Sequence, residues 1–435
     1  MKMDKEQRTY DAMTGLPDRM TFFADVKKYA EAGERVPVVL IQLTKLINVN
    51  RKYGVKAGDQ LLASIAGHLK ERCPGYEAYR IANSRFVLLG LEGGGQDAGE
   101  LVGSLHQRFT QTWPVVQEGE LFDISVKALF VQFYGEPEDC ENDLLDKMNY
   151  ALSVMAEKGK DGALFFDEQI QAAMEHKQYV MEEMRYAIEQ KTFQMYYQPI
   201  YDCAGGKFVS AESLIRLFGR DGEFISPGEF IPMAEECGLI DAISWIVLEK
   251  VCEFLGANPA LSLKTISVNM TGQQILDPTF IKRIEQNLEK YHVAGERLRI
   301  EITERTVTDD FAEVKRVMES LAQKGIHFYL DDFGTGYSNL SSMLSLPFEV
   351  IKFDQSLVQK MNESEKGLRT IGLLADIMHE NDFCIVAEGI ETREQAKAAS
   401  DKKLDRIQGF YYAQPLPGEE LIAFLARFCP TRTSW

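Results

Sequence analysis

From residue 192 onward, short runs rich in β-forming residues alternate with stretches long enough for a helix. This alternation constrains the fold more than any other feature of the chain. We interpret eight runs as strands: FQMYYQPIY, FVSAESLIR, TISVNM, LRIEITE, HFYLDDF, VIKFD, CIVAEG and RIQGFYYAQP. Helical stretches are expected at 227–255, 280–291, 311–325 and 365–381. The pattern predicts a TIM-like (β/α)8 barrel. Because no helix fits between the first two strands, we expect a modified barrel with one antiparallel strand.

Seven of these runs carry a charged or amide residue near their carboxyl end. They are Glu212, Asn269, Glu301, Asp331 with Asp332, Lys352, Glu388 and Gln408. In a barrel these ends meet on one face, which is where barrel active sites lie. A single polar residue there is usually a solvated rim position or a helix cap. So many carboxylates on one rim would repel one another without cations.

The oxygen ligands of this rim are carboxylates and an amide carbonyl, which favour the hard ions Mg²⁺ or Mn²⁺ over zinc or copper. The adjacent Asp331 and Asp332 fit a site for two ions, with one aspartate for each. Two ions held by carboxylates are suited to hydrolysing phosphate esters, because they activate a water molecule and stabilise the attacking and leaving oxygens. Lys352 would then hold or polarise that water.

Eight segments of the chain resemble, in order, the EAL domain of cyclic-di-GMP phosphodiesterases. They are YYQPI, AESLIR, SVNM, EITE, DDFGTGYSNL, IKFDQSLV, VAEGIET and IQGFYYAQPL, spread over roughly residues 190–425. The resemblance implies a modified (β/α)8 barrel that cleaves cyclic di-GMP to the linear dinucleotide pGpG with Mg²⁺ or Mn²⁺. It also implies a homodimer.

The resemblance assigns roles to individual residues. Five metal ligands are implied at the ends of four strands: Glu212, Asn269, Glu301 and Asp331 for one ion, and Asp332 for the second. Lys352 would orient the attacking water, and Glu388 would be a general base or a metal-associated acid. Arg216 would contact a substrate phosphate, and Gln408 would lie beside the guanine or the water shell of the metal. Glu304 would anchor the DDFGTGYSNL loop.

The chain departs from the family pattern at two places. The signature tripeptide reads ESL, so Ser213 replaces the alanine of EAL, and VNMTGQQI stands where VNLS is usual. Neither departure removes a metal ligand, so we expect both to leave the rim intact.

The first 167 residues predict a separate α+β domain. A buried strand is expected at 36–43, further strands at 79–90 and 122–133, and helices at 59–72 and 141–158. Strands and helices that alternate on this scale predict a sandwich with a largely antiparallel sheet.

The stretch 167–191 predicts a charged amphipathic helix, and we place a connecting helix at 168–191 between domains 1–167 and 192–435. Two interpretations stay open for this helix. It is either a connector or dimer seam between domains, or simply the first helix packed under the barrel, since an apolar stripe usually marks a core face.

The segment DAMTGLPDR at 11–19 resembles the opening of GGDEF domains, which make cyclic di-GMP from two GTP molecules. Aligning Tyr53–Gly54 with the family pattern places Gln42 where a metal-binding aspartate is expected. The signature pentapeptide reads ANSRF, so Arg85 replaces its metal-binding acid, and Ala156 replaces a lysine that would meet the triphosphate. These replacements imply a degenerate, regulatory GGDEF-like domain (a nucleotidyl-cyclase-like fold) without cyclase activity.

Asn50 and Asp59 match the guanine-reading positions of the GGDEF family. They leave open the binding of GTP as an effector without catalysis. The alternative is that Asn50 caps a turn and Asp59 caps a helix, which are common uses of these residue types.

Charge and composition restrict the partners of the chain. The formal net charge of −18 argues against a nucleic-acid polymer or an anionic membrane surface. No apolar run is long enough for a membrane helix, and no signal peptide opens the sequence. Seven scattered cysteines without a CxxC pair are typical of a reducing cytoplasm. A missing upstream segment would leave membrane association open.

Two functions from different classes fit these observations. The leading hypothesis is a phosphodiesterase that hydrolyses cyclic di-GMP to pGpG by two-metal-ion catalysis, with an inactive GGDEF domain as its regulator. The alternative is a weak or inactive cyclic-di-GMP receptor that signals through a partner or its dimer interface. Retention of every implied metal ligand, together with Lys352, Glu388 and Glu304, favours the enzyme.

Overall fold

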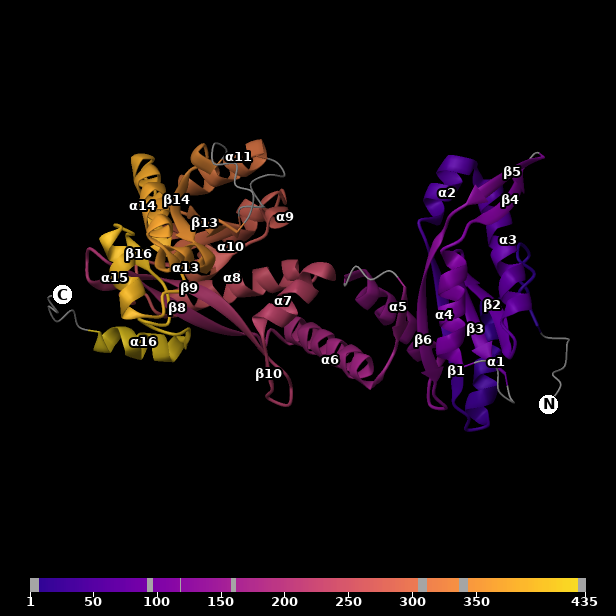
Figure 1. Ribbon diagram of the computed structural model, residues 1–435. Helices are drawn as coiled ribbons and strands as arrows, with labels where there is room; N and C mark the ends of the chain where they lie inside the picture. Colours follow the sequence, from indigo (N-terminus) through magenta and orange to yellow (C-terminus); the bar gives the residue numbers. More distant parts are fainter. Residues whose placement is uncertain are drawn as a thin grey trace. The chain divides into compact units, whose positions relative to one another are not determined.

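The computed structural model describes residues 8–91, 97–117, 119–157, 162–303, 311–335 and 343–428 (Figure 1). The chain divides into two compact units between Gln178 and Tyr179. This division falls within helix α6 (Glu168–Gln190), which forms over all but the last residue of the stretch 168–191 predicted as a connecting helix.

The first unit contains a five-stranded sheet, a two-stranded hairpin and flanking helices (Figure 1). Its strands are β1 (Val36–Thr44), β2 (Tyr76–Ala82), β3 (Arg85–Gly90), β4 (Trp113–Gln117), β5 (Glu120–Ile124), β6 (Lys127–Gly135) and β7 (Ala163–Phe165). Its helices before α6 are α1 (Arg19–Glu31), α2 (Leu46–Tyr53), α3 (Val55–Arg72), α4 (Ala98–Phe109) and α5 (Glu141–Glu157). The sheet order is β2-β3-β1-β6-β7, and β4 pairs with β5.

Strand β1 is apolar on both faces because helices cover both sides of the sheet. Val39 and Ile41 belong to the core formed with α3 and α4. Val38 and Leu40 point the other way, into the core formed with α1 and α5. Within the described residues, the β6–β7 pair is the parallel one and the other pairs of the sheet are antiparallel. The predicted sandwich with a largely antiparallel sheet is confirmed.

Three boundaries in this unit differ from the sequence predictions. The expected strand 79–90 is a hairpin, because the chain turns at Asn83–Ser84 between β2 and β3. The expected strand 122–133 is interrupted at Ser125–Val126, between β5 and β6. Helix α3 begins at Val55, so Asp59 lies inside it and is not its cap.

The second unit contains the barrel (Figure 1). Its strands are β8 (Gln194–Asp202), β9 (Lys207–Phe218), β10 (Phe224–Ile225), β11 (Thr265–Asn269), β12 (Leu298–Thr303), β13 (His327–Phe333), β14 (Phe348–Phe353), β15 (Cys384–Ala387), β16 (Arg406–Ile407) and β17 (Leu416–Pro417). Its helices are α7 (Pro227–Glu236), α8 (Ile240–Ala257), α9 (Gly272–Ile275), α10 (Phe280–Tyr291), α11 (Phe311–Ala322), α13 (Gln355–Glu363), α14 (Glu365–Glu380), α15 (Arg393–Asp401) and α16 (Gly418–Arg427), with a 3₁₀ turn η2 at Gly295–Arg297.

The barrel closes in the order β9-β11-β12-β13-β14-β15-β16-β8, and β8 then pairs with β9. Strand β8 is antiparallel to both of its neighbours, whereas the other pairs of the closed barrel are parallel. The reason is the short connection between β8 and β9, which is too short for a crossover helix. The predicted modified (β/α)8 barrel is confirmed.

Two predicted elements of this unit are shorter than expected. The stretch 227–255 forms α7 and α8, because Gly238 adopts φ +69° and ends the first helix. The last barrel strand stops at Ile407, and turns follow it. Among the helices of the described residues, none is both long enough and apolar enough to cross a lipid bilayer.

Candidate metal centre

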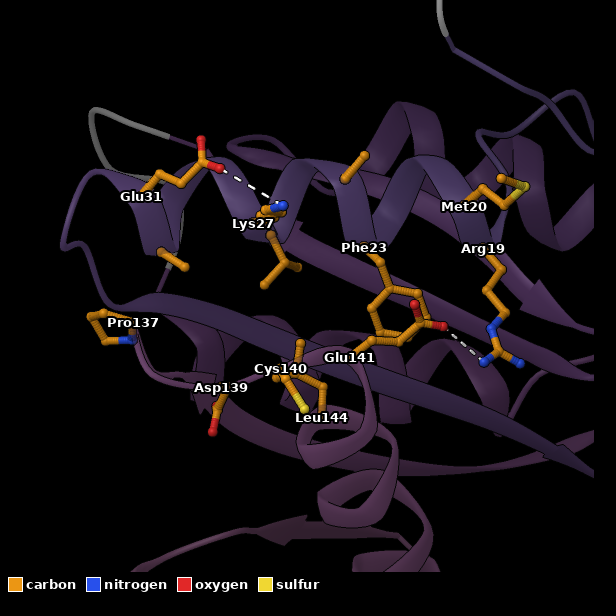
Figure 2. A pocket seen from close by; sticks show the side chains of 13 residues that line it. Arg19, Met20, Phe23, Lys27, Glu31, Pro137, Asp139, Cys140, Glu141 and Leu144 are labelled. Carbon is orange, nitrogen blue, oxygen red and sulfur yellow. Dashed lines mark hydrogen bonds and ion pairs between the residues drawn. The ribbon is translucent and has the colours of Figure 1, made fainter.

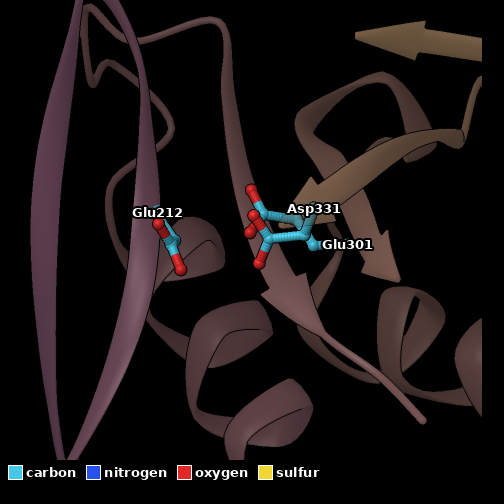
Figure 3. Close-up of side chains that lie close together, drawn as sticks. All are labelled: Glu212, Glu301 and Asp331. Carbon is cyan, nitrogen blue, oxygen red and sulfur yellow. The ribbon is translucent and has the colours of Figure 1, made fainter. Parts of the chain in front are cut away.

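Parallel register brings the polar strand ends of the barrel to one level. Asn269 of β11 pairs with Glu301 of β12. Asp331 of β13 pairs with Thr303 of β12, and Glu212 of β9 pairs with Ser267 of β11. The carboxylates of Glu212, Glu301 and Asp331 point toward one another across the barrel mouth (Figure 3). The structure therefore brings together side chains that the sequence placed on one rim.

Lys352 lies at the centre of the acidic residues. Its Nζ is 3.0 Å from Glu212 Oε2, 3.0 Å from Glu301 Oε2, 3.0 Å from Asp331 Oδ1 and 2.7 Å from Glu388 Oε1. The lysine side chain is 1% exposed. Four carboxylates thus face one ammonium group in a water-poor site.

Two amide side chains also hold the Glu212 carboxylate. Asn269 Nδ2 donates to Glu212 Oε1 at 3.1 Å, and Gln408 Nε2 donates to Oε2 at 2.6 Å. Gln408 Nε2 also donates to Gln198 Oε1 at 3.1 Å, and Gln198 Nε2 donates to the Ala413 carbonyl at 3.2 Å. This chain of amides fixes the orientation of the Gln408 side chain.

The backbone at Asp332 explains how two adjacent aspartates reach the same site. Successive residues of a regular strand point to opposite faces. Asp332 has φ +57°, and the pairing of β13 with β14 is irregular between Leu330 and Phe333. Left-handed backbone is uncommon for a non-glycine residue and occurs mostly where surrounding structure enforces it. Here it keeps Asp331 and Asp332 close to Glu388.

Burial and crowding shift the pKa values of these groups. Burial, with repulsion from Glu212, raises the pKa of Glu301 well above its usual range. Burial also raises the pKa of Glu388 to about 8, against the opposing effect of the Lys352 charge. Burial opposes ionisation of Glu212 too, but the Lys352 charge and hydrogen bonds outweigh it and lower this pKa. The surrounding carboxylates raise the pKa of Lys352 despite its burial. Added positive charge would stabilise such a cluster.

The donor set fits divalent ions. Oxygen atoms of Glu212, Glu301 and Asp331 lie within 4.8 Å of one another, and the same holds for Asp331, Asp332 and Glu388. Asp331 belongs to both groups, which suits a carboxylate between two ions. Gln408 Oε1 is buried and accepts no hydrogen bond from a described residue, so it is free to accept one from a metal-bound water. The oxygen-only set suits Mg²⁺ or Mn²⁺.

Arg216 lies on the same face of β9 as Glu212, four residues nearer the carboxyl end of the strand. It is half-buried, and desolvation lowers the pKa of its guanidinium. Glu304 lies outside the described residues. Gln198 was not predicted, although it belongs to the quoted segment YYQPI. Its signal was a polar residue inside the buried part of the strand, between Tyr197 and Pro199.

The serine of the ESL tripeptide points away from the acidic cluster. Ser213 is buried, and its Oγ donates to the Ser267 carbonyl of the neighbouring strand at 2.6 Å. Ser213 therefore joins β9 to β11 without approaching the metal ligands.

In the first unit, the two positions at which the GGDEF resemblance implies metal ligands belong to a network of hydrogen bonds. Gln42 and Arg85 are cross-strand partners on β1 and β3. Arg85 Nε donates to Gln42 Oε1 at 2.7 Å, and Arg85 Nη1 donates to Asn149 Oδ1 at 2.8 Å. Gln42 Nε2 donates to Ser84 Oγ at 2.8 Å. A guanidinium and an amide thus occupy the two positions at which the GGDEF resemblance implies metal-binding acids.

Asn50 packs against α3 of the first unit. Its Oδ1 is buried without a hydrogen-bond partner in the described chain, and a Cβ on Gly58 would lie 2.0 Å from it. Asp59, one residue further along α3, is half-buried. The two residues are therefore near each other in the fold.

A separate groove of about 680 Å³ lies between α1 and the start of α5 (Figure 2). Arg19 and Glu141 form an ion pair of 2.9 Å at one end of it, and Phe23 lies in its wall. None of the predicted site residues lines this groove.

The second unit is a closed, modified (β/α)8 barrel. At the carboxyl ends of its strands lie two groups of acidic residues, and each group is a candidate site for one ion. The EAL domain pattern matches residues 181–415, more than half of the chain, so the chain belongs to the EAL domain family. The family described as diguanylate cyclase, GGDEF domain, matches residues 8–161. A GGDEF domain therefore precedes the EAL domain.

Several known proteins are similar over nearly the whole chain. Signaling protein YkoW of Bacillus subtilis is 27% identical over 428 residues, which are 96% of this chain and 53% of that protein. Cyclic di-GMP phosphodiesterase NbdA of Pseudomonas aeruginosa is 25% identical over 431 residues, 98% of this chain and 55% of that protein. The chain thus spans about half the length of these curated relatives.

A solved structure resembles the barrel unit. The PaMucR phosphodiesterase in complex with c-di-GMP is 27% identical, with a TM-score of 0.52. It covers 56% of this chain, and the match includes 99% of the PaMucR chain.

Proposed function

We propose that this chain hydrolyses cyclic di-GMP to pGpG with two divalent ions bound at the barrel rim, and that its GGDEF domain is a catalytically inactive regulator. The observation that carries the proposal is the cluster of four carboxylates within 3.0 Å of Lys352 Nζ at the carboxyl ends of the barrel strands. The relative NbdA, named as a cyclic di-GMP phosphodiesterase, supports the choice of substrate.

The proposed metal ligands are the residues named from the sequence, with Asp331 shared. Glu212, Asn269, Glu301 and Asp331 would hold one ion, and Asp331 and Asp332 would hold the second, with Glu388 beside them. Bound ions of this kind activate a water molecule and stabilise charge on the phosphate oxygens. Hydrolysis adds the water oxygen to phosphorus and breaks a phosphorus–oxygen ester bond, which opens the cyclic dinucleotide.

Protein side chains would supply the remaining functions. Lys352 would orient the attacking water, because its ammonium group already lies among the carboxylates. Glu388, whose Oε1 lies 2.7 Å from Lys352 Nζ, would act as a general base or as an acid associated with the metal. Arg216 would bind a substrate phosphate, and Gln408 would hold a water or the guanine with its free Oε1. Glu304 would anchor the following loop.

The proposed inactivity of the GGDEF domain rests on Gln42 and Arg85. A cyclase must hold cations against a triphosphate, and a fixed guanidinium in that position repels them. The hydrogen bonds of Arg85 to Gln42 and Asn149 keep the guanidinium there. Binding of GTP near Asn50 and Asp59, and a homodimer, stay predictions of the family resemblance.

The test is turnover by the purified full chain. After chelation of metals, cyclic di-GMP is added with Mg²⁺ or Mn²⁺, and pGpG is followed by chromatography. We expect metal-dependent pGpG, and none from Glu212→Ala. Glu183→Ala is a matched control, because Glu183 is also a buried acid of the same unit but pairs with Arg220 and belongs to neither acidic group of the rim. Tight binding of cyclic di-GMP without product would instead support the receptor alternative.

A further inference from the structure

We propose that Tyr196 is a positioning residue whose ring holds the Arg216 guanidinium at the barrel mouth, ready to bind a phosphate of the substrate. This inference rests on the proposed function and adds a residue to which the sequence assigned no role. Tyr196 belongs to strand β8, the antiparallel strand of the barrel.

The register of β8 and β9 places the two side chains on one face. Tyr196 pairs with Leu214, and Gln194 pairs with Arg216. Alternate residues of a strand share a face, so Leu214 and Arg216 lie on the side of β9 that carries Glu212. Tyr196 and Arg216 are then diagonal neighbours, a relation within reach of aromatic and long side chains. The guanidinium carbon lies 5.2 Å from the centroid of the Tyr196 ring, inside the range of a cation–π contact.

The remaining contacts of Arg216 leave its charge available. Its Nη1 donates to the Ile215 carbonyl at 2.9 Å. Within the described part of the chain, Arg216 forms no ion pair with a carboxylate. Arg220, four residues further on, differs in this respect, because its Nη2 lies 2.6 Å from Glu183 Oε1. One arginine is therefore neutralised within the protein, and the other is held by a ring and a carbonyl oxygen.

A holding contact matters at this position because of the acidic cluster. Four residues of extended strand place Arg216 roughly 13 Å along β9 from Glu212. The carboxylates attract a flexible guanidinium toward the metal ligands. An arginine side chain also has many rotamers, and restricting them beforehand reduces the entropy lost when a ligand binds. Tyr196 opposes both effects, so its removal should weaken substrate binding more than turnover.

The first experiment compares variants of the full chain in hydrolysis of cyclic di-GMP with Mn²⁺. For Tyr196→Leu we expect kcat/KM to fall about five- to thirtyfold, through a higher KM, because the aromatic face is lost. Tyr196→Phe keeps that face and should stay within about twofold of the wild type. The matched control is Tyr186→Leu, since the Tyr186 ring lies 5.3 Å from the Arg220 guanidinium, a pair outside the metal centre. This control should leave KM unchanged.

A double-mutant cycle tests whether Tyr196 acts through Arg216. In an Arg216→Ala background, Tyr196→Leu should cause no further loss of kcat/KM, because the two residues act as one unit. An equal loss in both backgrounds, an equal loss for Tyr196→Phe and Tyr196→Leu, or a fall in kcat at unchanged KM would overturn the proposal.

The same variants separate this proposal from the proposed function. If the wild type makes no pGpG, the phosphodiesterase assignment fails, and equilibrium binding of cyclic di-GMP with Mn²⁺ replaces KM in the cycle. A loss of affinity in Tyr196→Leu that disappears in the Arg216→Ala background would still support the role of Tyr196. Absence of both turnover and binding would overturn both proposals.

Discussion

Replacement of Lys352 by methionine should destabilise the barrel unit strongly without divalent ions and much less with them. Lys352 is 1% exposed and is the shared cationic partner of Glu212, Glu301, Asp331 and Glu388, at 2.7–3.0 Å. Methionine preserves most of the side-chain volume but removes the charge. Removing one partner of a buried ion pair typically costs about 3–5 kcal/mol, because the other charge stays buried and unpaired. Protonation of the buried carboxylates removes part of their charge and so limits the loss of unfolding free energy.

The assay is scanning calorimetry of the full chain with a chelator or with Mn²⁺. A loss of about 3–5 kcal/mol corresponds to a fall in Tm of roughly 6–20 °C for a unit of this size. With Mn²⁺ the difference from the wild type should shrink to less than half, because bound cations neutralise the same carboxylates. Lys147→Met is the matched control. Lys147 is buried and pairs with Asp139 at 2.6 Å in the first unit, so its loss should be the same with and without Mn²⁺. A Lys352→Met chain as stable as the wild type in chelator, or one equally destabilised in both conditions, would refute the reasoning.

Three further predictions concern other residues of the barrel unit. Ser213→Ala should lower the unfolding free energy by about 1 kcal/mol, measured in urea, because the hydrogen bond to the Ser267 carbonyl is lost, while turnover stays close to wild type. Gln198→Ala should raise the Mn²⁺ concentration needed for half-maximal activity about tenfold in a metal titration, because Gln408 loses the partner that orients it. An unchanged Mn²⁺ requirement would contradict this role of the Gln198–Gln408 hydrogen bond. Two lysines lower the pKa of Glu249 to about 2, so its ionised form stabilises the fold above pH 4.5, and this contribution disappears as the pH falls toward 2. Glu249→Gln should therefore lower the unfolding free energy by roughly 1 kcal/mol at pH 7, a modest amount because both lysines are exposed. Near pH 2, the same urea assay should show no difference between this variant and the wild type.

The barrel and its rim could be predicted from sequence because each strand carries its own signal. Strand runs such as HFYLDDF and VIKFD place their polar residues at the carboxyl end, and parallel pairing then brings Asp331 and Lys352 to one face. The antiparallel first strand was predictable for a similar reason, since the link to β9 is too short for a helix. These inferences need only local pattern and known barrel geometry.

Other features depend on contacts between segments far apart in the chain. The left-handed backbone at Asp332 accompanies irregular pairing with β14, and an aspartate in the sequence does not by itself announce this conformation, although it tolerates it. Gln198 reaches Gln408, 210 positions away, so its role follows from barrel closure and not from its own strand. The Tyr196–Arg216 contact likewise follows from the register of β8 against β9. In the first unit, the turn at Asn83–Ser84 contains no glycine, which is the residue that most often marks a two-residue hairpin turn in a sequence.

The most direct test of the central claim is hydrolysis of cyclic di-GMP by the metal-stripped full chain in ¹⁸O-labelled water, followed by mass spectrometry. With Mn²⁺ restored, the account predicts pGpG that carries a single solvent-derived oxygen on its terminal phosphate, and no product while the chelator is present. Product formed without a divalent ion, product without the label, or no product from metal-loaded chain would contradict a metal-dependent phosphodiesterase at this rim.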